Sequence, residues 1–363
     1  MKPPLNGVTV IDFSELLPGP FLTQNLCELG AEVIKIERPP HGDNARRLAP
    51  GVFSATNRGK RSIVADLKDL EERAKVRELV AGADILVETY RPGVMARLGL
   101  DYDSLAKDFP KLIYASLTGY GQDGPLASLP GHDVNYLAAS GAIALSGAAG
   151  AGPAHTFGLP TADLCGAMYG FSAVLAALYQ RRDTGKGQYL DISITECMVH
   201  WLNPRIGHFH EAGMADLSVQ RRDVLTKPAY GVFATRDGRH ITVGALEDHF
   251  WARLVKALGM SAFERPEFGS YPRRVEVADA INTLLAQKVN ALDLVEIEAL
   301  LREADVPVAP VVAPFDVAMF EQFKQRGLPV ETAHGTFARF PVRLSGVSGM
   351  PSVPPALGSD REL

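Results

Sequence analysis

The chain has 363 residues, a formal net charge of −5, 22% charged residues and 46% hydrophobic residues. This length and apolar content are sufficient for a large hydrophobic core and exclude a predominantly disordered chain. The balanced charge gives neither the basic footprint of a nucleic-acid-binding protein nor an acidic tail. We therefore expect a globular protein with two domains, or with one large domain and a smaller lobe, and no nucleic-acid partner.

The cysteines, the N-terminal residues and the longest apolar stretch indicate the cellular compartment in which the protein is expected. Cys27, Cys165 and Cys197 are widely separated and form no CxxC pair, so they do not indicate a disulfide framework. Residues 1–7 lack the apolar run of a signal peptide. The apolar stretch Leu164–Tyr179 is short for a membrane span and is predicted to be a buried core helix. We expect a cytoplasmic protein with no membrane partner.

Strand and helix patterns alternate in the first third of the chain. Val8–Phe13 and Ala31–Glu37 are predicted strands on either side of a helix over Phe21–Leu29, which together form a βαβ unit. The alternation continues through Asp69–Val80 (helix), Asp84–Val87 (strand), Val94–Leu98 and Tyr102–Asp108 (helices) and Leu112–Leu117 (strand). This order predicts an α/β fold with a doubly wound parallel sheet. The first turn has neither GxGxxG nor GxxxxGK[ST], so no nucleotide motif supports a site there.

Residues 225–315 have a different pattern. Tyr230–Ala234 and His240–Val243 flank Asp237-Gly238, which is a strong hairpin signal. Further predicted elements are helices over Asp248–Leu258, Val275–Ala286 and Leu292–Glu303, the β-branched run Val306–Val312 and a strand around Phe337–Leu344. We predict a smaller α+β domain over 225–315.

One acidic residue lies alone in a long uncharged stretch. Between Val134 and Gln180, Asp163 is the only formally charged side chain. An ionised carboxylate is costly in apolar surroundings, and burial raises its pKa, so Asp163 is a candidate functional residue. The alternative is that Asp163 N-caps a helix beginning at Leu164. The two roles are compatible, because a cap leaves one carboxylate oxygen free at the helix N-terminus.

A histidine lies just upstream of this stretch, in Gly131-His132-Asp133. Histidine titrates near neutral pH and is suited to proton transfer, although a lone histidine is also common as a structural residue. The sequence contains no HExxH motif and no Cys/His cluster, so we expect no metal site.

Basic residues are concentrated in the first part of the chain, several of them after predicted strands. Ligands of doubly wound sheets bind at that edge, and arginine and lysine recognise phosphate. The group is therefore either a site for a phosphate-bearing ligand or a solvated basic face. Its members are Lys35, Arg38, Arg46, Arg47, Arg58, Lys60, Arg61 and Arg91.

A series of short motifs runs in order through residues 5–250, namely Val10–Phe13, Pro18–Pro20, Leu29–Pro39, Asn57–Ile63, Glu88–Val94, Leu98–Leu100, Gly119–Pro125, Gly185–Gln188 and Tyr230–Phe233. Together they resemble the family III CoA-transferases (the CaiB/BaiF superfamily), which group formyl-CoA and carnitine CoA-transferases with α-methylacyl-CoA racemases. The resemblance implies an interlocked homodimer in which each chain has a Rossmann-like large domain and a small α+β domain. It places the large domain at 1–190, completed by about 325–363, linker helices at 191–224 and the small domain at 225–315.

The resemblance also implies a CoA thioester substrate, with no cofactor besides the CoA of the substrate. The implied CoA or substrate contacts are Arg38, Arg58, Lys60, Arg61, Arg91, Asp133 and Tyr230. Asp163 matches the catalytic aspartate, which is a nucleophile in the transferases and an acid/base group in the racemases. His132 matches the second base of the racemases, and Glu247 matches the glutamate that hydrogen-bonds this histidine.

Two activities remain open. The first hypothesis is epimerisation of a 2-methylacyl-CoA, in which His132 and Asp163 exchange protons on opposite faces of the α-carbon and Glu247 orients the imidazole. The alternative is CoA transfer to a carboxylate acceptor, in which Asp163 carries the covalent chemistry. The motif around His132 favours the racemase. Leu159 departs from the racemase pattern, which has an asparagine four residues before the aspartate.

Overall fold

The chain forms two compact units. The computed structural model describes residues 1–148, 150–154, 158–345 and 353–360. The first unit comprises Met1–Ile143, Phe157–Ile206 and Ala318–Leu363, and the second comprises Ala144–Thr156 and Gly207–Val317. The chain therefore leaves the first unit twice and returns to it twice.

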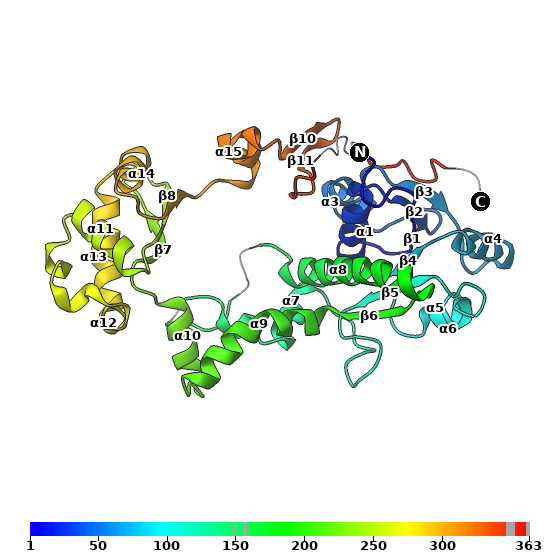
Figure 1. Cartoon of the computed structure of the whole chain (residues 1–363), viewed down its shortest axis with the longest axis horizontal. Helices are drawn as coiled ribbons and strands as arrows, with labels where there is room; N and C mark the ends of the chain where they lie inside the picture. The colour runs from blue at the N-terminus through cyan, green and yellow to red at the C-terminus, as the bar shows by residue number, and fades with distance from the viewer. Residues whose placement is uncertain (149, 155–157, 346–352, 361–363) are drawn as a thin grey trace. The chain divides into compact units, whose positions relative to one another are not determined.

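A six-stranded parallel sheet forms the centre of the first unit (Figure 1). Its strands lie in the order β3-β2-β1-β4-β5-β6, and each neighbouring pair is parallel. Their bounds are β1 (Thr9–Asp12), β2 (Glu32–Glu37), β3 (Arg61–Val64), β4 (Ile85–Glu88), β5 (Ile113–Thr118) and β6 (Tyr189–Ser193). In this order the chain reverses its direction of winding between β1 and β4, and a crevice opens at the carboxyl ends of these strands. The predicted α/β fold with a parallel sheet is confirmed.

Alternate side chains of the central strands supply two hydrophobic cores, one on each face of the sheet. Val10 and Ile85 belong to one core, whereas their neighbours Ile11 and Leu86 belong to the other. All four side chains are fully buried. Because both faces of a parallel sheet are covered, its strands are apolar at consecutive positions, which is why these strands were recognisable in the sequence.

Helices cover the two faces. α1 (Pro18–Glu28) and α8 (Thr161–Thr184) pack side by side over one core, and α4 (Leu70–Ala81), α5 (Val94–Leu98) and α6 (Tyr102–Leu105) cover the other (Figure 1). The other short elements of this unit are α2 (Ala45–Leu48), α3 (Pro50–Thr56), α7 (Asp133–Ala139), α15 (Glu321–Gln325) and the hairpin β10 (Pro329–Thr332) and β11 (Gly335–Ala338). Three elements contain boundaries between the units, namely η1 (Ile143–Leu145), α9 (Ile194–Glu211) and η4 (Pro314–Met319).

The second unit has its own core and sheet. Its antiparallel strands are β7 (Tyr230–Ala234), β8 (His240–Gly244) and β9 (Val308–Pro310), and β7 and β8 form the hairpin predicted around Asp237-Gly238. The helices are α10 (Leu217–Leu225), α11 (Asp248–Ala257), η2 (Ser261–Phe263), η3 (Pro266–Gly269), α12 (Tyr271–Glu276), α13 (Ala278–Asn290) and α14 (Leu294–Glu303). Apolar residues of α11, α13, α14 and the sheet form one buried cluster.

Several elements differ from the sequence predictions. The strands β3 and β6 were not predicted, because each contains charged or polar residues among few apolar ones. The chain around Phe337–Leu344 forms the second strand of a hairpin, and this strand ends at Ala338. The core helix predicted over Leu164–Tyr179 extends over Thr161–Thr184. By length and composition, α8 is the one helix of the described residues able to cross a membrane, yet it packs on β5 and β6 as a core helix.

The chain before β6 requires a glycine. Gly187 donates its backbone N–H to the carbonyl oxygen of Pro110 at 2.9 Å, and a Cβ at this position would lie 2.0 Å from the carbonyl oxygen of Leu112. Backbone atoms cannot move aside as the end of a flexible side chain can. The absence of a side chain at Gly187 therefore allows β6 to join the sheet beside β5.

We expect Gly187→Ala to destabilise the protein by about 1–3 kcal/mol, because β6 must shift away from β5. The midpoint of thermal unfolding measures the effect. Gly51→Ala is the matched control, since a Cβ at Gly51 meets no atom within 4 Å, and we expect a change of less than about 0.5 kcal/mol there. Equal unfolding midpoints for the two variants would contradict the prediction.

Candidate active site

A cavity of about 630 Å³ opens at the carboxyl edge of the parallel sheet, within the first unit. Its walls come from the segments that follow β1, β2, β4 and β5, together with the N-terminal ends of α7 and α8. The lining includes Glu15, Leu16, Arg38, Tyr90, Arg91, His132, Tyr136 and Asp163. This is the edge at which doubly wound sheets bind their ligands.

Asp163 lies in the first turn of α8 and lines this cavity. The helix begins at Thr161 and its N-cap is Pro160, so the prediction that Asp163 caps a helix beginning at Leu164 is wrong. Asp133 serves the helix N-terminus instead, because its Oδ1 accepts hydrogen bonds from the backbone N–H groups of Ala162 at 2.7 Å and Asp163 at 3.1 Å. The carboxylate of Asp163 is therefore not needed as a cap.

The surroundings of Asp163 favour its protonated form. Burial, and then the nearby negative charge of Asp133, raise the pKa of Asp163 to about 7. A carboxyl group with such a pKa is ionised in only about half of the molecules at neutral pH. When ionised, it is a poorly solvated carboxylate at the wall of a cavity, which is the condition of a reactive nucleophile or base.

His132 lines the same cavity from the N-terminus of α7. Its backbone N–H donates to Oδ1 of Asn135 at 3.0 Å, and the Tyr136 hydroxyl donates to the carbonyl oxygen of Gly131 at 2.6 Å. The Tyr136 ring packs edge-on against Tyr120 with centroids 5.3 Å apart. These contacts fix the turn before α7, while the His132 side chain stays exposed. The structure thus brings His132 and Asp163, which lie 31 positions apart in the sequence, to one cavity.

The predicted CoA contacts separate into two groups. Arg38 and Arg91 line the cavity, and Arg38 forms a loose ion pair with Glu15 at 3.3 Å with its side chain 55% exposed. Both guanidinium groups are therefore accessible to an anionic ligand. Tyr136 and Glu15 were not predicted as site residues, because only the folded chain brings them to the cavity that Asp163 also lines.

Arg58, Lys60 and Arg61 have structural partners. The Lys60 ammonium is buried and contacts Asp12 at 3.1 Å, and the buried Arg58 contacts Glu28 at 2.6 Å. Arg61 on β3 pairs with Glu32 and Asp360. Of the predicted basic CoA contacts, Arg38 and Arg91 line the cavity, whereas the roles predicted for Arg58, Lys60 and Arg61 stay predictions.

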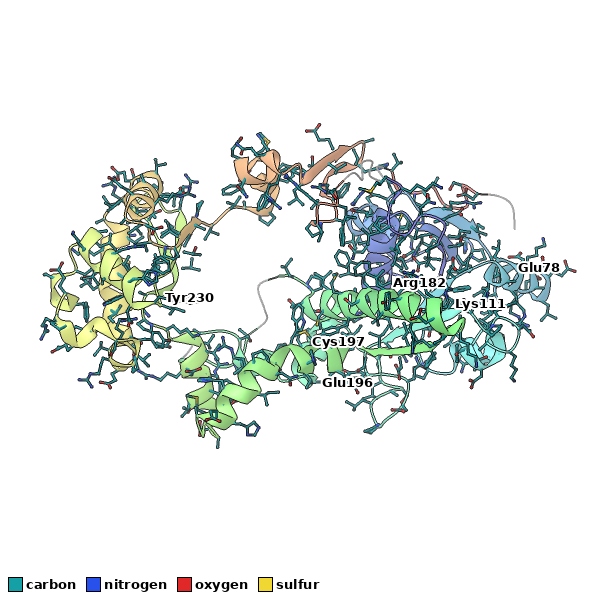
Figure 2. All side chains as sticks on the ribbon, viewed as in Figure 1. Glu78, Lys111, Arg182, Glu196, Cys197 and Tyr230 are labelled. Carbon is teal, nitrogen blue, oxygen red and sulfur yellow. The ribbon has the colours of Figure 1, made fainter. Side chains whose placement is uncertain are left out.

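Glu247 and Tyr230 belong to the second unit. Glu247 precedes α11 as its N-cap residue, and Tyr230 lies on β7 with its side chain exposed (Figure 2). Their predicted roles, as the partner of His132 and as a substrate contact, stay predictions. No group of three or more metal-binding side chains occurs within the described ranges.

The chain is similar in sequence and structure to proteins of one known family. The profile of CoA-transferase family III matches residues 5–361. The chain is 36% identical to the acetyl-CoA:oxalate CoA-transferase of Acetobacter aceti, over 95% of this chain and 90% of that protein. It is 32% identical to the alpha-methylacyl-CoA racemase of Homo sapiens, over 89% and 81% of the two chains. Among solved structures, a CAIB/BAIF family protein from Brucella suis has a TM-score of 0.88 and 32% identity, over 99% of this chain and 97% of that chain.

We expect Asp133→Asn to lower the pKa of Asp163 below about 7. The substitution removes the neighbouring negative charge, whereas the amide Oδ1 still accepts the two backbone hydrogen bonds at the start of α8. Burial remains, so the pKa should stay above the usual aspartate value of about 3.9. A carboxyl ¹³C NMR titration, with Asp163→Asn to assign the signal, measures the shift. An unchanged pKa would show that the Asp133 charge has no effect on Asp163.

Proposed function

Because the chain belongs to CoA-transferase family III, we propose that it transfers CoA from an acyl-CoA thioester to a dicarboxylate, with Asp163 as the nucleophile. The observation that carries the proposal is the Asp163 carboxyl group, buried at the wall of a cavity and not used as a helix cap. Three relatives support the choice of acceptor, since their names specify oxalate or glutarate as the CoA acceptor. CoA transfer, which was the alternative at the level of the sequence, thereby becomes the first hypothesis, and racemisation becomes the second.

The chemistry follows from one nucleophilic carboxylate. Ionised Asp163 attacks the thioester carbonyl, the C–S bond breaks, and CoA thiolate leaves a mixed anhydride on Asp163. The thiolate then attacks the Asp163 acyl carbon, which releases the donor acid and forms an aspartyl-CoA thioester. The acceptor carboxylate attacks this thioester and releases CoA thiolate again. Attack of the thiolate on the acceptor acyl carbon gives the new acyl-CoA and regenerates the Asp163 carboxylate.

Arg38 and Arg91 complete this proposal. CoA carries phosphate groups, and the two accessible guanidinium groups on the cavity wall provide donors that match phosphate geometry. Each cycle consumes one acyl-CoA thioester and forms another, so this series of reactions needs no further cofactor or metal. We propose that the enzyme is active in the presence of a metal chelator and that it acts in the cytoplasm on soluble CoA esters.

Racemisation is the second candidate, and the position of His132 favours it. His132 and Asp163 line one cavity, so a thioester α-carbon between them could exchange protons with both. The relative from Homo sapiens that is named a racemase is 32% identical to this chain. Leu159, with its side chain 54% exposed, is the departure from the racemase pattern noted above.

We expect the wild-type protein to convert acetyl-CoA or succinyl-CoA into a new acyl-CoA when oxalate, glutarate or malate is added, as followed by mass spectrometry. The rate should rise with pH through about 7, because only the ionised form of Asp163 is a nucleophile. Asp163→Asn should reduce transfer by at least ~10³-fold. Hydroxylamine should trap a hydroxamate at Asp163 after addition of acyl-CoA.

His132→Ala is the matched variant for the choice between the two activities. Transfer needs no second base, so this variant should keep transfer within about tenfold of wild type. Incubation with 2-methylacyl-CoA in deuterium oxide, without a carboxylate acceptor, tests the second candidate. Deuterium uptake with inversion, lost in both His132→Ala and Asp163→Asn, together with no transfer, would replace the transferase assignment by a racemase.

We also propose that two chains form a homodimer, interlocked as in the resemblance above, that covers the exposed face of α8 and α9. Each of these two helices carries large exposed apolar side chains within the first unit, and exposed apolar surface can indicate a protein partner. They are Met168, Tyr179, Val199, Trp201 and Ile206. Light scattering after size exclusion should give a dimer for wild type and a monomer for Trp201→Glu. Leu70→Glu, at an even more exposed position on α4, should remain dimeric, and a monomeric wild type would refute the proposal.

A further inference from the structure

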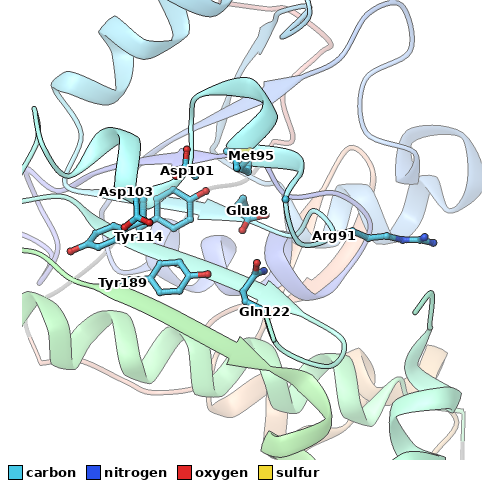
Figure 3. Close-up of a pocket in the computed structure, with 11 residues that line it drawn as sticks. Glu88, Arg91, Met95, Asp101, Asp103, Tyr114, Gln122 and Tyr189 are labelled. Carbon is cyan, nitrogen blue, oxygen red and sulfur yellow. The ribbon is translucent and has the colours of Figure 1, made fainter. Parts of the chain in front are cut away.

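A second cavity of about 260 Å³ lies in the first unit and shares Arg91 with the first cavity (Figure 3). Its walls include the end of β4, the N-terminal part of α6 and tyrosines from β5 and β6. Glu88, the last residue of β4, lies among these walls with its side chain 3% exposed. The proposed reaction does not use this carboxyl group, so its burial needs another explanation.

Glu88 is bonded to the turn that follows its own strand. Its Oε2 accepts a hydrogen bond from the backbone N–H of Tyr90 at 2.7 Å. The Ser116 hydroxyl, on the neighbouring strand β5, also bonds to the carboxyl group and accepts a hydrogen bond from Nε2 of Gln122 at 2.7 Å. The carboxyl group thus connects the segment after β4 with the segment after β5.

The turn held by Glu88 belongs to the candidate active site. Tyr90 and Arg91 both line the first cavity. Figure 3 shows the Arg91 side chain directed away from Glu88 and from the other side chains of the second cavity. Any influence of Glu88 on Arg91 therefore passes through the backbone of the turn, and the guanidinium remains available to a ligand.

We propose that Glu88 is a positioning residue for Arg91. Glu88 holds the turn 88–91 so that the Arg91 guanidinium meets an anionic group of the CoA substrate. The inference rests on the proposed function, because it takes CoA as the ligand of the first cavity. A fixed backbone limits the directions that the Arg91 side chain can take, which reduces the entropy lost when phosphate binds. Loss of the Glu88 contact should therefore weaken CoA binding without removal of any group that touches CoA.

The protonation state of Glu88 should modulate this effect. Burial, opposed by the hydrogen bonds from Ser116 and Tyr90 and assisted by the negative charge of Asp191 on β6, raises the pKa of Glu88 to about 7. The other titratable groups that line this cavity or interact with Glu88 are Tyr90, Asp101, Tyr102, Asp103, Tyr114 and Tyr189, while the Arg91 side chain points away (Figure 3). A carboxylate is a stronger acceptor than a carboxylic acid. The Tyr90 N–H bond should therefore become stronger as pH rises through about 7, and CoA binding should tighten with it.

A double-mutant cycle tests the route through Arg91. Calorimetric titration with CoA measures Kd for wild type, Glu88→Ala, Arg91→Ala and the double variant. We expect each single substitution to raise Kd about tenfold and the double variant to bind no more weakly than Arg91→Ala alone. Asp103→Asn removes a charge from the same cavity without touching the turn, so its Kd should equal that of wild type.

Glu88→Gln separates positioning from a loss of packing. Glutamine keeps an acceptor oxygen for Tyr90 but cannot ionise, so its Kd should match wild type at pH 6 and be several-fold higher at pH 8. If Glu88→Ala does not fold, as judged by circular dichroism, this pH comparison carries the test.

The outcomes are distinguishable. If Glu88→Ala binds CoA like wild type, or weakens binding equally in the presence and absence of Arg91, the inference is wrong while the proposed function stands. If Glu88→Gln parallels wild type at both pH values, Glu88 does not act through its charge, and the inference fails in the same way. If wild type does not bind CoA, the proposed function fails first.

Discussion

Two buried ion pairs, at the carboxyl ends of β1 and β2, stabilise the wall of the cavity that these strands form. Lys60 contacts Asp12 at 3.1 Å, and Lys35 contacts Asp43 at 2.9 Å, with all four side chains inaccessible to solvent. Buried charges are costly unless they are paired, so replacement of either lysine alone would leave its partner carboxylate buried without that cation. Burial would raise the pKa of Asp12, but Lys60 and Lys35 hold it well below its usual range. Asp12 therefore stays ionised and keeps its contacts across the neutral pH range.

These ion pairs determine the shape of one cavity wall. Lys35 donates to the carbonyl oxygen of Ser14 at 2.6 Å, and Asp43 accepts from the backbone N–H of Leu16 at 3.0 Å. Leu16 has φ 67°, a left-handed conformation that a residue with a side chain adopts only when its surroundings require it. The network thus stabilises a strained turn that places Glu15 and Leu16 beside Arg38.

Much of the fold could be predicted because it depends on local patterns. The buried strands β1, β2, β4 and β5 are apolar at consecutive positions, and the hairpin of β7 and β8 has Asp237-Gly238 at its turn. Asp163 could be identified because charge is missing from the residues around it. The cap from Asp133 could not be predicted, since it joins two helices 30 positions apart. For the same reason the sequence could not distinguish Lys60, which is paired with residues of other elements, from Arg38, which lines the cavity.

The carboxyl groups of this edge differ in function according to their partners. Asp12 and Asp43 are paired with lysines and are structural. Burial, together with a neighbouring acidic group, raises the pKa of both Glu88 and Asp163, and the hydrogen bonds of Glu88 only partly oppose this rise. The last two groups therefore have a pKa of about 7, and they ionise over the same range of pH. In the proposed mechanism, ionisation of Asp163 creates the nucleophile, and in the further inference ionisation of Glu88 strengthens the contact that fixes the Arg91 turn. Substrate binding and covalent chemistry would then increase together as pH rises, although the two carboxyl groups line separate cavities.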